Sequence, residues 1–203
     1  LMYEDKEIIL IRHGQSDANQ KNKEHYVSNS NTPEIFHNPN SHLTDNGIKQ
    51  AAATRDFLVE NELFSSDDWE CLYCSPFNRT RKTAEIIGEP VNRLPIIDFR
   101  LHEHIYGMAN FTKEMLPFNV DGYIIDEMDT DEAMLDRLNS FLIESLQDLD
   151  KIVVVGHGGP IQTMIEIIKG NQVVPEWDRS IKNCSITHFQ FGKLVLDRYV
   201  GHL

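Results

Sequence analysis

Cysteine is scarce in this sequence, and that scarcity excludes a disulfide-stabilised scaffold. The chain has 203 residues and three cysteines, Cys71, Cys74 and Cys184. Small secreted domains held by disulfides have many more cysteines for their length, in an even number. We therefore expect free thiols that pack as small apolar side chains, and a protein of the reducing cytoplasm.

Long apolar runs are also missing, which argues against a membrane segment. The longest are Ile8–Ile11 and Ile152–Val155, far below the roughly 20 residues that span a bilayer. The first seven residues are charged and lack the apolar stretch of a signal peptide. We expect a cytoplasmic protein with no membrane partner.

Positive charge is in deficit, and this disfavours nucleic-acid binding. The sequence has 19 Lys and Arg against 32 Asp and Glu, a formal net charge of -13. Such a surface repels nucleic-acid phosphates. An anionic small substrate would therefore need a local cationic pocket that overcomes the global field.

The distribution of apolar residues predicts an α/β fold. Forty per cent of the residues are hydrophobic and 25% are charged, which is typical of a globular domain. Short β-rich runs alternate with helical periodicity, as in a parallel sheet. We predict a three-layer sandwich, with a mainly parallel sheet flanked by helices, in one domain over residues 1–203 with a short lid at about 104–130. The predicted strands are Glu7–Arg12, Trp69–Cys74, Leu94–Ile97, Lys151–Val155 and a terminal hairpin of Cys184–Phe191 and Leu194–Val200; the predicted helices are Thr44–Glu60 with Ile48, Ala51, Ala52 and Leu58 inward, Asn78–Ile87, one from Asp131, and Pro160–Lys169.

Two predicted strands end in a histidine beside glycine. The first continues as Arg12, His13 and Gly14, and the second as Gly156, His157 and Gly158. Ligands of open parallel sheets gather at the carboxyl ends of the strands. The pattern therefore favours a pair of histidines that face one site.

Arg79 adds a cation to this end of the sheet. It falls in the first turn of the helix after the second strand, where the helix dipole disfavours positive charge. An anionic partner would explain the placement. Together with Arg12, His13 and His157, Arg79 would form a cationic pocket whose guanidinium groups bind phosphate oxygens.

Five sequence blocks resemble the histidine phosphatase superfamily, which has the phosphoglycerate-mutase-like fold. They occur in the family's order over about residues 7–160, and any one alone would be weak. The blocks are Arg12–Asn19, Leu43–Ala51, Ser75–Ala84, Leu101–Gly107 and Gly156–Gly158.

The resemblance implies a covalent phosphohistidine mechanism without metal or cofactor. His13 would be the nucleophile, and Arg12, Arg79 and His157 would bind the phosphoryl oxygens. Glu103 would protonate the leaving oxygen and later accept a proton from water. The resemblance further implies that the substrate-binding residues include Gly14, Ser16, Asn19 and Gly158.

Several alternatives compete with this interpretation. A metal site is disfavoured, because His102, Glu103 and His104 do not have the spacing of a metalloprotease helix. A redox-active cysteine pair is also disfavoured, because Cys71 and Cys74, three apart in a predicted strand, would point to opposite faces. An α/β-hydrolase needs a G-x-S-x-G turn, which the sequence lacks. A catalytically inactive binding module would have lost at least one of the five residues to which the resemblance gives a catalytic role. All five are present, namely Arg12, His13, Arg79, Glu103 and His157.

Within the family, the sequence favours a phosphatase of the histidine acid type over a cofactor-dependent phosphoglycerate mutase. Such mutases have an arginine soon after the first block and a basic insertion after the catalytic acid. Here residues 20–23 contain no arginine. The segment from Met108 to Asp131 has one basic residue, Lys113, and six acidic residues, Glu114, Asp121, Asp126, Glu127, Asp129 and Asp131. We expect a small phosphorylated metabolite as substrate; the sequence does not indicate whether the chain forms a homo-oligomer.

Overall fold

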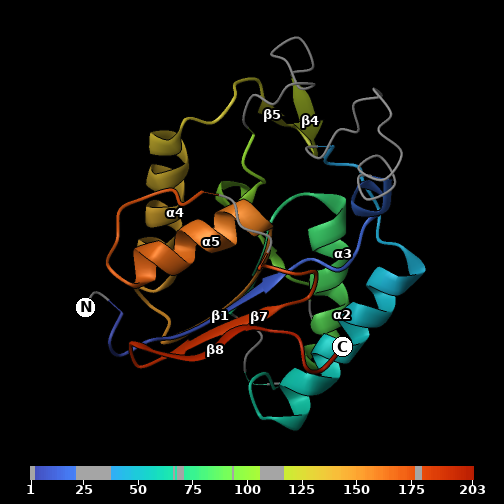
Figure 1. Ribbon diagram of the computed structural model, residues 1–203, viewed down its shortest axis with the longest axis vertical. Coiled ribbons are helices and arrows are strands. Elements are labelled where there is room, and N and C mark those ends of the chain that lie inside the picture. The colour runs from blue at the N-terminus through green and yellow to red at the C-terminus, as the bar shows by residue number, and fades with distance from the viewer. Residues whose placement is uncertain are drawn as a thin grey trace.

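A six-stranded sheet organises the chain in the computed structural model (Figure 1). The structure describes residues 3–21, 38–65, 67, 71–92, 94–105, 117–176 and 180–203. The strand order is β3-β2-β6-β1-β7-β8. The strands are β1 (Glu7–Arg12), β2 (Leu72–Cys74), β3 (Ile96–Ile97), β6 (Lys151–Gly156), β7 (Ile186–Gln190) and β8 (Lys193–Tyr199). β1, β6, β2 and β3 pair in parallel, and β7 and β8 add antiparallel pairs.

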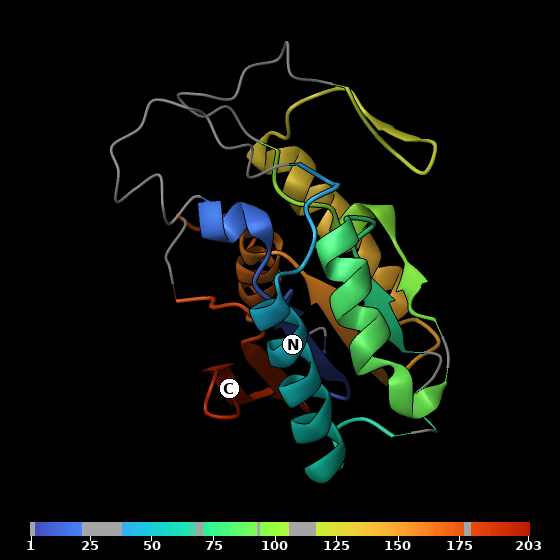
Figure 2. The ribbon, with the colours of Figure 1, turned by 90° about the vertical axis from the view of Figure 1, so that its right-hand side faces the viewer.

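Helices cover both faces of the sheet, which confirms the three-layer α/β prediction. α2 (Asp45–Glu60) and α3 (Asn78–Ile87) lie side by side on one face (Figure 2), and α4 (Asp131–Ser145) and α5 (Gly158–Ile168) lie on the other. Two 3₁₀ turns, η2 (Glu89–Val91) and η3 (Phe99–Leu101), complete the connections on either side of β3. Within the described parts of the chain, no helix has the length and apolar composition needed to cross a membrane.

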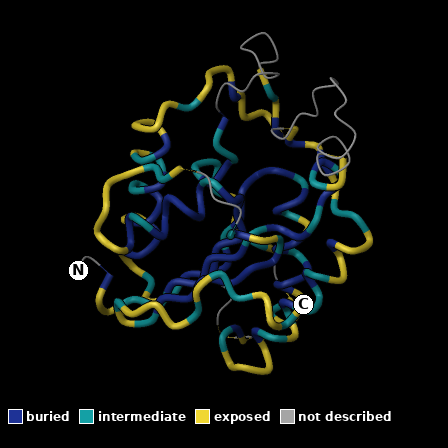
Figure 3. Tube along the Cα trace, viewed as in Figure 1, coloured by how far each residue is buried: buried dark blue, intermediate teal, exposed yellow. Residues whose placement is uncertain are grey.

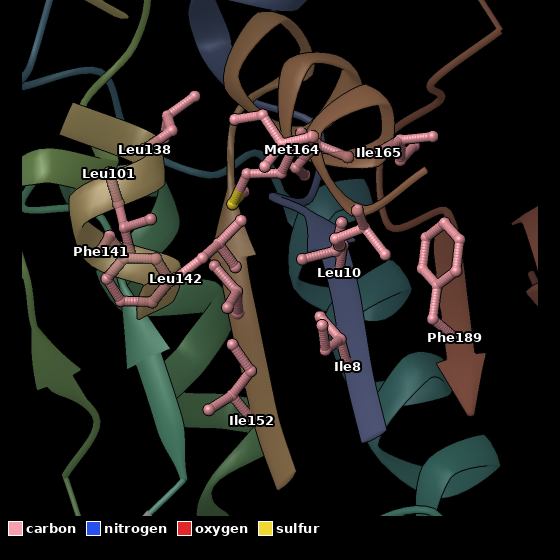
Figure 4. Close-up of a cluster of buried hydrophobic side chains, with 14 of the residues drawn as sticks. Ile8, Leu10, Leu101, Leu138, Phe141, Leu142, Ile152, Met164, Ile165 and Phe189 are labelled. Atoms are coloured by element: carbon pink, nitrogen blue, oxygen red, sulfur yellow. The ribbon is translucent and has the colours of Figure 1, made fainter. Parts of the chain in front are cut away.

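The core is split by the sheet because successive side chains of a strand point to opposite faces. In β1, Ile9 and Ile11 pack with Leu58 of α2. Ile8 and Leu10 pack towards α4 and α5, among the side chains of Figure 4. The central strands are accordingly buried along their length (Figure 3). Burying each such side chain contributes about 1.5–3 kcal/mol.

The Thr44 cap, the end of α2 at Glu60 and the burial of Ala51 and Leu58 were predicted correctly, but the inward position of Ile48 was wrong. Ile48 is 42% exposed, and Gly47 is buried instead. The reason is a close backbone contact, because a Cβ on Gly47 would lie 2.0 Å from the Gln15 carbonyl oxygen. This approach turns α2 so that Ile48 points outward.

Other boundaries also moved. β2 begins at Leu72, whereas the predicted start at Trp69 lies outside the described residues. Cys71 therefore precedes the strand and joins the same apolar cluster as Cys74, so the two cysteines do not occupy opposite faces as predicted. α5 begins at Gly158 rather than Pro160, because the first helical turn needs no N–H from proline.

A small hairpin went unpredicted. β4 (Phe118–Val120) and β5 (Tyr123–Ile125) pair antiparallel around Asp121 and Gly122, both at positive φ. Asp-Gly at such a turn is a strong hairpin signal, so the sequence did contain the information. The hairpin packs through Val120 and Ile125 against Phe77 and Ile105.

Candidate active site

His13 and His157 meet where β1 and β6 end. The two strands are parallel neighbours in register, with Arg12 opposite Gly156. His13 N donates to the Gly156 carbonyl at 3.0 Å, and the two imidazole centroids are 5.3 Å apart. Sheet pairing therefore brings together two residues that are far apart in the sequence.

Arg79, the second residue of α3, lies between the two rings. It donates from Nε to His13 Nε2 at 3.2 Å, and its Nη2 is 3.2 Å from His157 Nδ1. Its Nη1 donates to the Asn38 carbonyl at 2.9 Å, and the guanidinium lies 5.0 Å from the Phe77 ring centroid. Arg79 is 2% exposed, and burial lowers its pKa to about 10.

The hydrogen bonds of His13 determine which ring nitrogen can act as a nucleophile. Nδ1 lies 2.7 Å from the Gly14 carbonyl. Because a carbonyl only accepts, Nδ1 carries the proton and Nε2 has the lone pair. Burial, with further contributions from Arg79 and Arg12, holds the pKa of His13 well below its usual value of 6.5. His13 is thus neutral near pH 7, with Nε2 directed at Arg79.

His157 has the opposite tautomer. Arginine only donates, so Nδ1 accepts from Arg79 and Nε2 carries the proton. Ser75 Oγ lies 2.7 Å from Nε2 and receives that proton's hydrogen bond. Burial and the neighbouring Arg79 lower the pKa of His157 well below 6.5. Ser75 was part of a recognised block, but no role was predicted for it.

Glu103 brings a carboxylate to the same group. Its Oε2 is 3.5 Å from His157 Nδ1 and 3.8 Å from Arg79 Nη2. Its Oε1 accepts from His104 N at 3.0 Å. Burial raises the pKa of Glu103, although Arg79 and the His104 N–H oppose the rise. A carboxyl group in such surroundings is suited to carry and release a proton.

Arg12 adds a second, half-buried guanidinium group to the site. Its Nη1 donates to the Ile181 carbonyl at 2.6 Å, and burial lowers its pKa, while Glu103 opposes this shift. Glu103 thus attracts both guanidinium groups, and Asp17 also attracts that of Arg79. Arg12 and Arg79 repel each other, so an anion bound between the two guanidinium groups would be stabilised by both. The site therefore offers local positive charge in a chain whose formal net charge is -13.

The helices that begin at the site differ from those that do not. α2 and α4 have threonine caps, Thr44 and Thr130, and acidic first turns. α3 and α5 begin after Phe77 and His157 with no side-chain cap and no acid in the first turn. Their N–H groups and positive dipole ends also favour an anion, and Gly158 is the first residue of α5.

Asn19 and Ser16 form a network beside His13. Asn19 Oδ1 accepts from Ser16 N and from Asn183 Nδ2, both at 3.1 Å, and Asn183 also donates to the His13 carbonyl at 3.0 Å. With Oδ1 engaged in this way, the Asn19 amide Nδ2 is the donor that this side chain would offer to an anion. Asn183 was missed because nothing local marks it and it contacts Asn19 across 164 positions.

Glycine is needed at position 14 because the backbone of α2 lies very close to it. A Cβ there would lie 2.5 Å from the Gly47 carbonyl oxygen, so Gly14 allows α2 to approach. Its N–H donates to Thr83 Oγ1 at 3.0 Å, which ties the residue after the strand to α3. The glycine thus fixes the position of His13 through packing.

His102, immediately before Glu103, is structural by its contacts. His102 Nδ1 lies 2.7 Å from the Glu103 carbonyl, and burial lowers its pKa to about 4. Among the residues that the structure describes, no group of three or more His, Cys, Asp and Glu side chains is arranged to hold a metal ion.

Two facing histidines, two arginines and a nearby carboxyl group on this fold form a site suited to binding an anion such as phosphate. The model of the histidine phosphatase superfamily (branch 1) matches residues 8–195. The chain belongs to this superfamily.

Proteins named as phosphatases and proteins named as phosphoglycerate mutases both resemble the chain. It is 28% identical to an uncharacterized phosphatase, PhoE, of Bacillus subtilis, over 92% of this chain and 89% of that protein. It is 30% identical to a 2,3-bisphosphoglycerate-dependent phosphoglycerate mutase of Thermoplasma acidophilum, over 96% and 88%. Phosphoserine phosphatase of Entamoeba histolytica, solved with 3-phosphoglyceric acid, superposes with a TM-score of 0.66 at 21% identity, covering 97% of this chain and 98% of that one. The last comparison supports the fold.

Proposed function

We propose that the protein hydrolyses small phosphate monoesters through a phosphohistidine on His13 Nε2. The observation that carries this proposal is the hydrogen bond between His13 Nδ1 and the Gly14 carbonyl at 2.7 Å. It fixes the tautomer that leaves Nε2 unprotonated, as in-line attack on phosphorus requires. The depressed pKa of His13 maintains this form at neutral pH.

The arginines and His157 would stabilise the transferring group. As the phosphoryl group arrives, Arg79 would exchange its contacts with the two imidazoles for phosphoryl oxygens, and Arg12 would add a second guanidinium. These cations are already placed and desolvated, so little reorganisation accompanies the reaction. Asn19, Ser16, Gly14 and Gly158 would complete the binding of phosphate.

Glu103 would supply and recover the proton. Protonated Glu103 would donate to the leaving oxygen as the P–O bond breaks, and the resulting carboxylate would accept a proton from the water that attacks phosphohistidine. Its raised pKa and its position near His157 support this role. The cycle needs no metal and no cofactor.

The structure changes the argument for hydrolysis over mutase action. Asp121 forms an ion pair with Arg81, and Asp129 pairs with Arg137, so these two acids do not act as unpaired charges against an acidic substrate. Segment 108–131 would therefore repel an acidic substrate less strongly than its six acids alone suggest. Lys113 lies outside the described residues. The absence of arginine at residues 20–23 still supports hydrolysis.

The relatives suggest the substrates with which to begin. The Entamoeba enzyme is named for phosphoserine, a small phosphorylated carboxylic acid, and was solved with 3-phosphoglyceric acid. The Thermoplasma mutase keeps phosphoglycerate interconversion as the second candidate. We accordingly propose phosphorylated small acids as the first substrate class for this chain.

Phosphate release and interconversion can be measured in one reaction. The enzyme is supplied with phosphoserine or 3-phosphoglycerate, with and without 2,3-bisphosphoglycerate, in the presence of a chelator. We expect phosphate release that the chelator does not change, and no interconversion started by the bisphosphate. Interconversion of 2- and 3-phosphoglycerate faster than phosphate release would establish the mutase instead.

A further inference from the structure

Glu103 lies on a segment with no regular structure. It follows η3, and the described segment ends at Ile105, before residues 106–116. Unlike His13 and His157, it has no sheet pairing to fix it. Something else must hold its carboxylate near His157.

Two side chains provide that support, Asp129 and Arg137, which we call the clasp. Arg137 Nη2 donates to Asp129 Oδ2 at 2.9 Å. Arg137 Nη1 donates to the His102 carbonyl at 3.1 Å and also to the Arg100 carbonyl. A single guanidinium from α4 therefore holds the backbone just before Glu103.

Asp129 holds the backbone just after Glu103. Its Oδ2 accepts from Ile105 N at 3.0 Å, and its own N–H donates to the Ile105 carbonyl at 2.6 Å. Ile105 and Asp129 therefore close the base of the segment that contains the β4–β5 hairpin. Glu103 is fixed from both sides by one ion pair.

The clasp is well shielded from solvent. The Asp129 and Arg137 side chains are 10% and 12% exposed. A shielded ion pair that also satisfies backbone groups is costly to break from one side, because the remaining charge stays buried. We propose that Asp129 and Arg137 are positioning residues that hold Glu103 where it protonates the leaving oxygen, an inference that rests on the proposed function.

Leaving groups distinguish positioning from general stability. Alkyl phosphates have basic leaving oxygens and need the acid, whereas aryl phosphates with acidic leaving groups need it much less. In Arg137→Met, kcat/KM for an alkyl phosphate should fall about 10²-fold, the size of a misplacement of about 1 Å. The value for p-nitrophenyl phosphate should fall much less.

A matched arginine provides the control. Arg55 of α2 also pairs with two acids, Asp56 and Glu89, and both of these partners lie outside the candidate site. Arg55→Met should leave both substrates unaffected. Arg137→Lys restores charge but not the planar group that reaches two carbonyls and a carboxylate, so it should recover only part of the alkyl activity.

Glu103→Gln separates this inference from the proposed function. If Glu103→Gln slows alkyl and aryl substrates equally, the acid role fails and the clasp has no function to support. If Glu103→Gln is selective but Arg137→Met slows both substrates equally, only the clasp proposal fails.

If Arg137→Met does not fold, Asp129→Asn provides the test, because the amide keeps the size of the side chain and an oxygen that accepts from Ile105 N. A selective loss supports the proposal, and an equal loss or no loss overturns it.

Discussion

The candidate site has two halves that are built in different ways. His13 and His157 follow neighbouring parallel strands, and their relative position is set by sheet hydrogen bonds such as His13 N to the Gly156 carbonyl. Glu103 lies on an irregular segment, and side chains from beyond the hairpin hold it. His13 is thus fixed by backbone pairing, and Glu103 by an ion pair.

This difference indicates which half tolerates substitution. Backbone pairing does not depend on the identity of distant side chains, so the strand-end half should keep its geometry when remote residues change. The Glu103 half depends on Asp129 and Arg137. Changes outside the site should therefore affect proton donation more readily than nucleophilic attack.

The largest effect should come from removing the nucleophile. His13→Ala should lower turnover of every phosphate ester by at least about 10³-fold, because the proposed phosphoryl intermediate forms on His13. Steady-state kinetics and acid-labile phosphate incorporation measure this. His42→Ala, at an exposed position, is the control. Activity above a few per cent in His13→Ala would remove His13 as the nucleophile.

Removing the acid should have a smaller and selective effect. Glu103→Gln keeps the shape of the side chain but not the proton, so kcat/KM for alkyl phosphates should fall by roughly 10²–10⁴. Aryl phosphates should be affected much less. Glu85→Gln, on the outer part of α3, should behave as wild type. Equal losses for both substrate classes would contradict the assignment of Glu103.

Removing the support of His157 should have a smaller effect that is not selective. Ser75→Ala leaves the Nε2 proton of His157 without its acceptor, which costs about 1–3 kcal/mol and corresponds to a loss of roughly 5- to 150-fold in rate. Alkyl and aryl substrates should lose activity equally, because phosphoryl binding and not protonation is impaired. Ser145→Ala is a matched control, since that buried hydroxyl donates within α4 to the Phe141 carbonyl, away from the site. A selective loss in Ser75→Ala would place Ser75 in the Glu103 half.

The smallest effects should be changes in the dependence of kcat/KM on pH. We expect the acidic limb of this profile to report the ionisation of His13, and the alkaline limb that of Glu103. The pKa of His13 lies well below 6.5, so protonation reduces kcat/KM only at acidic pH. The pKa of Glu103 is raised above 4.5, so loss of its proton reduces kcat/KM for alkyl phosphates as the pH rises. Glu103→Gln should remove the alkaline limb and keep the acidic one. The phosphate ester's own ionisation is common to both proteins and cancels. An acidic limb centred above pH 6.5 would contradict the neutral His13.

The sequence by itself determined the elements that carry the strand-end half. β1 is Glu7–Arg12 and α3 is Asn78–Ile87, as predicted, because apolar runs and helical periodicity are local signals. The family resemblance rested on the same segments, and the match over residues 8–195 confirms it. Arg79, placed against the helix dipole, could be recognised as an anion-binding candidate from its position alone.

Only the tertiary structure decided what supports these residues. The contacts of Asn183 with Asn19, of Gly47 with the segment at Gly14, and of Arg137 with the backbone around Glu103 join segments that no local pattern connects. Each depends on how strands order in the sheet and on the rotation of a helix about its axis. Those quantities follow from packing over the whole core, and this is why Ile48 was misplaced while Thr44 was not.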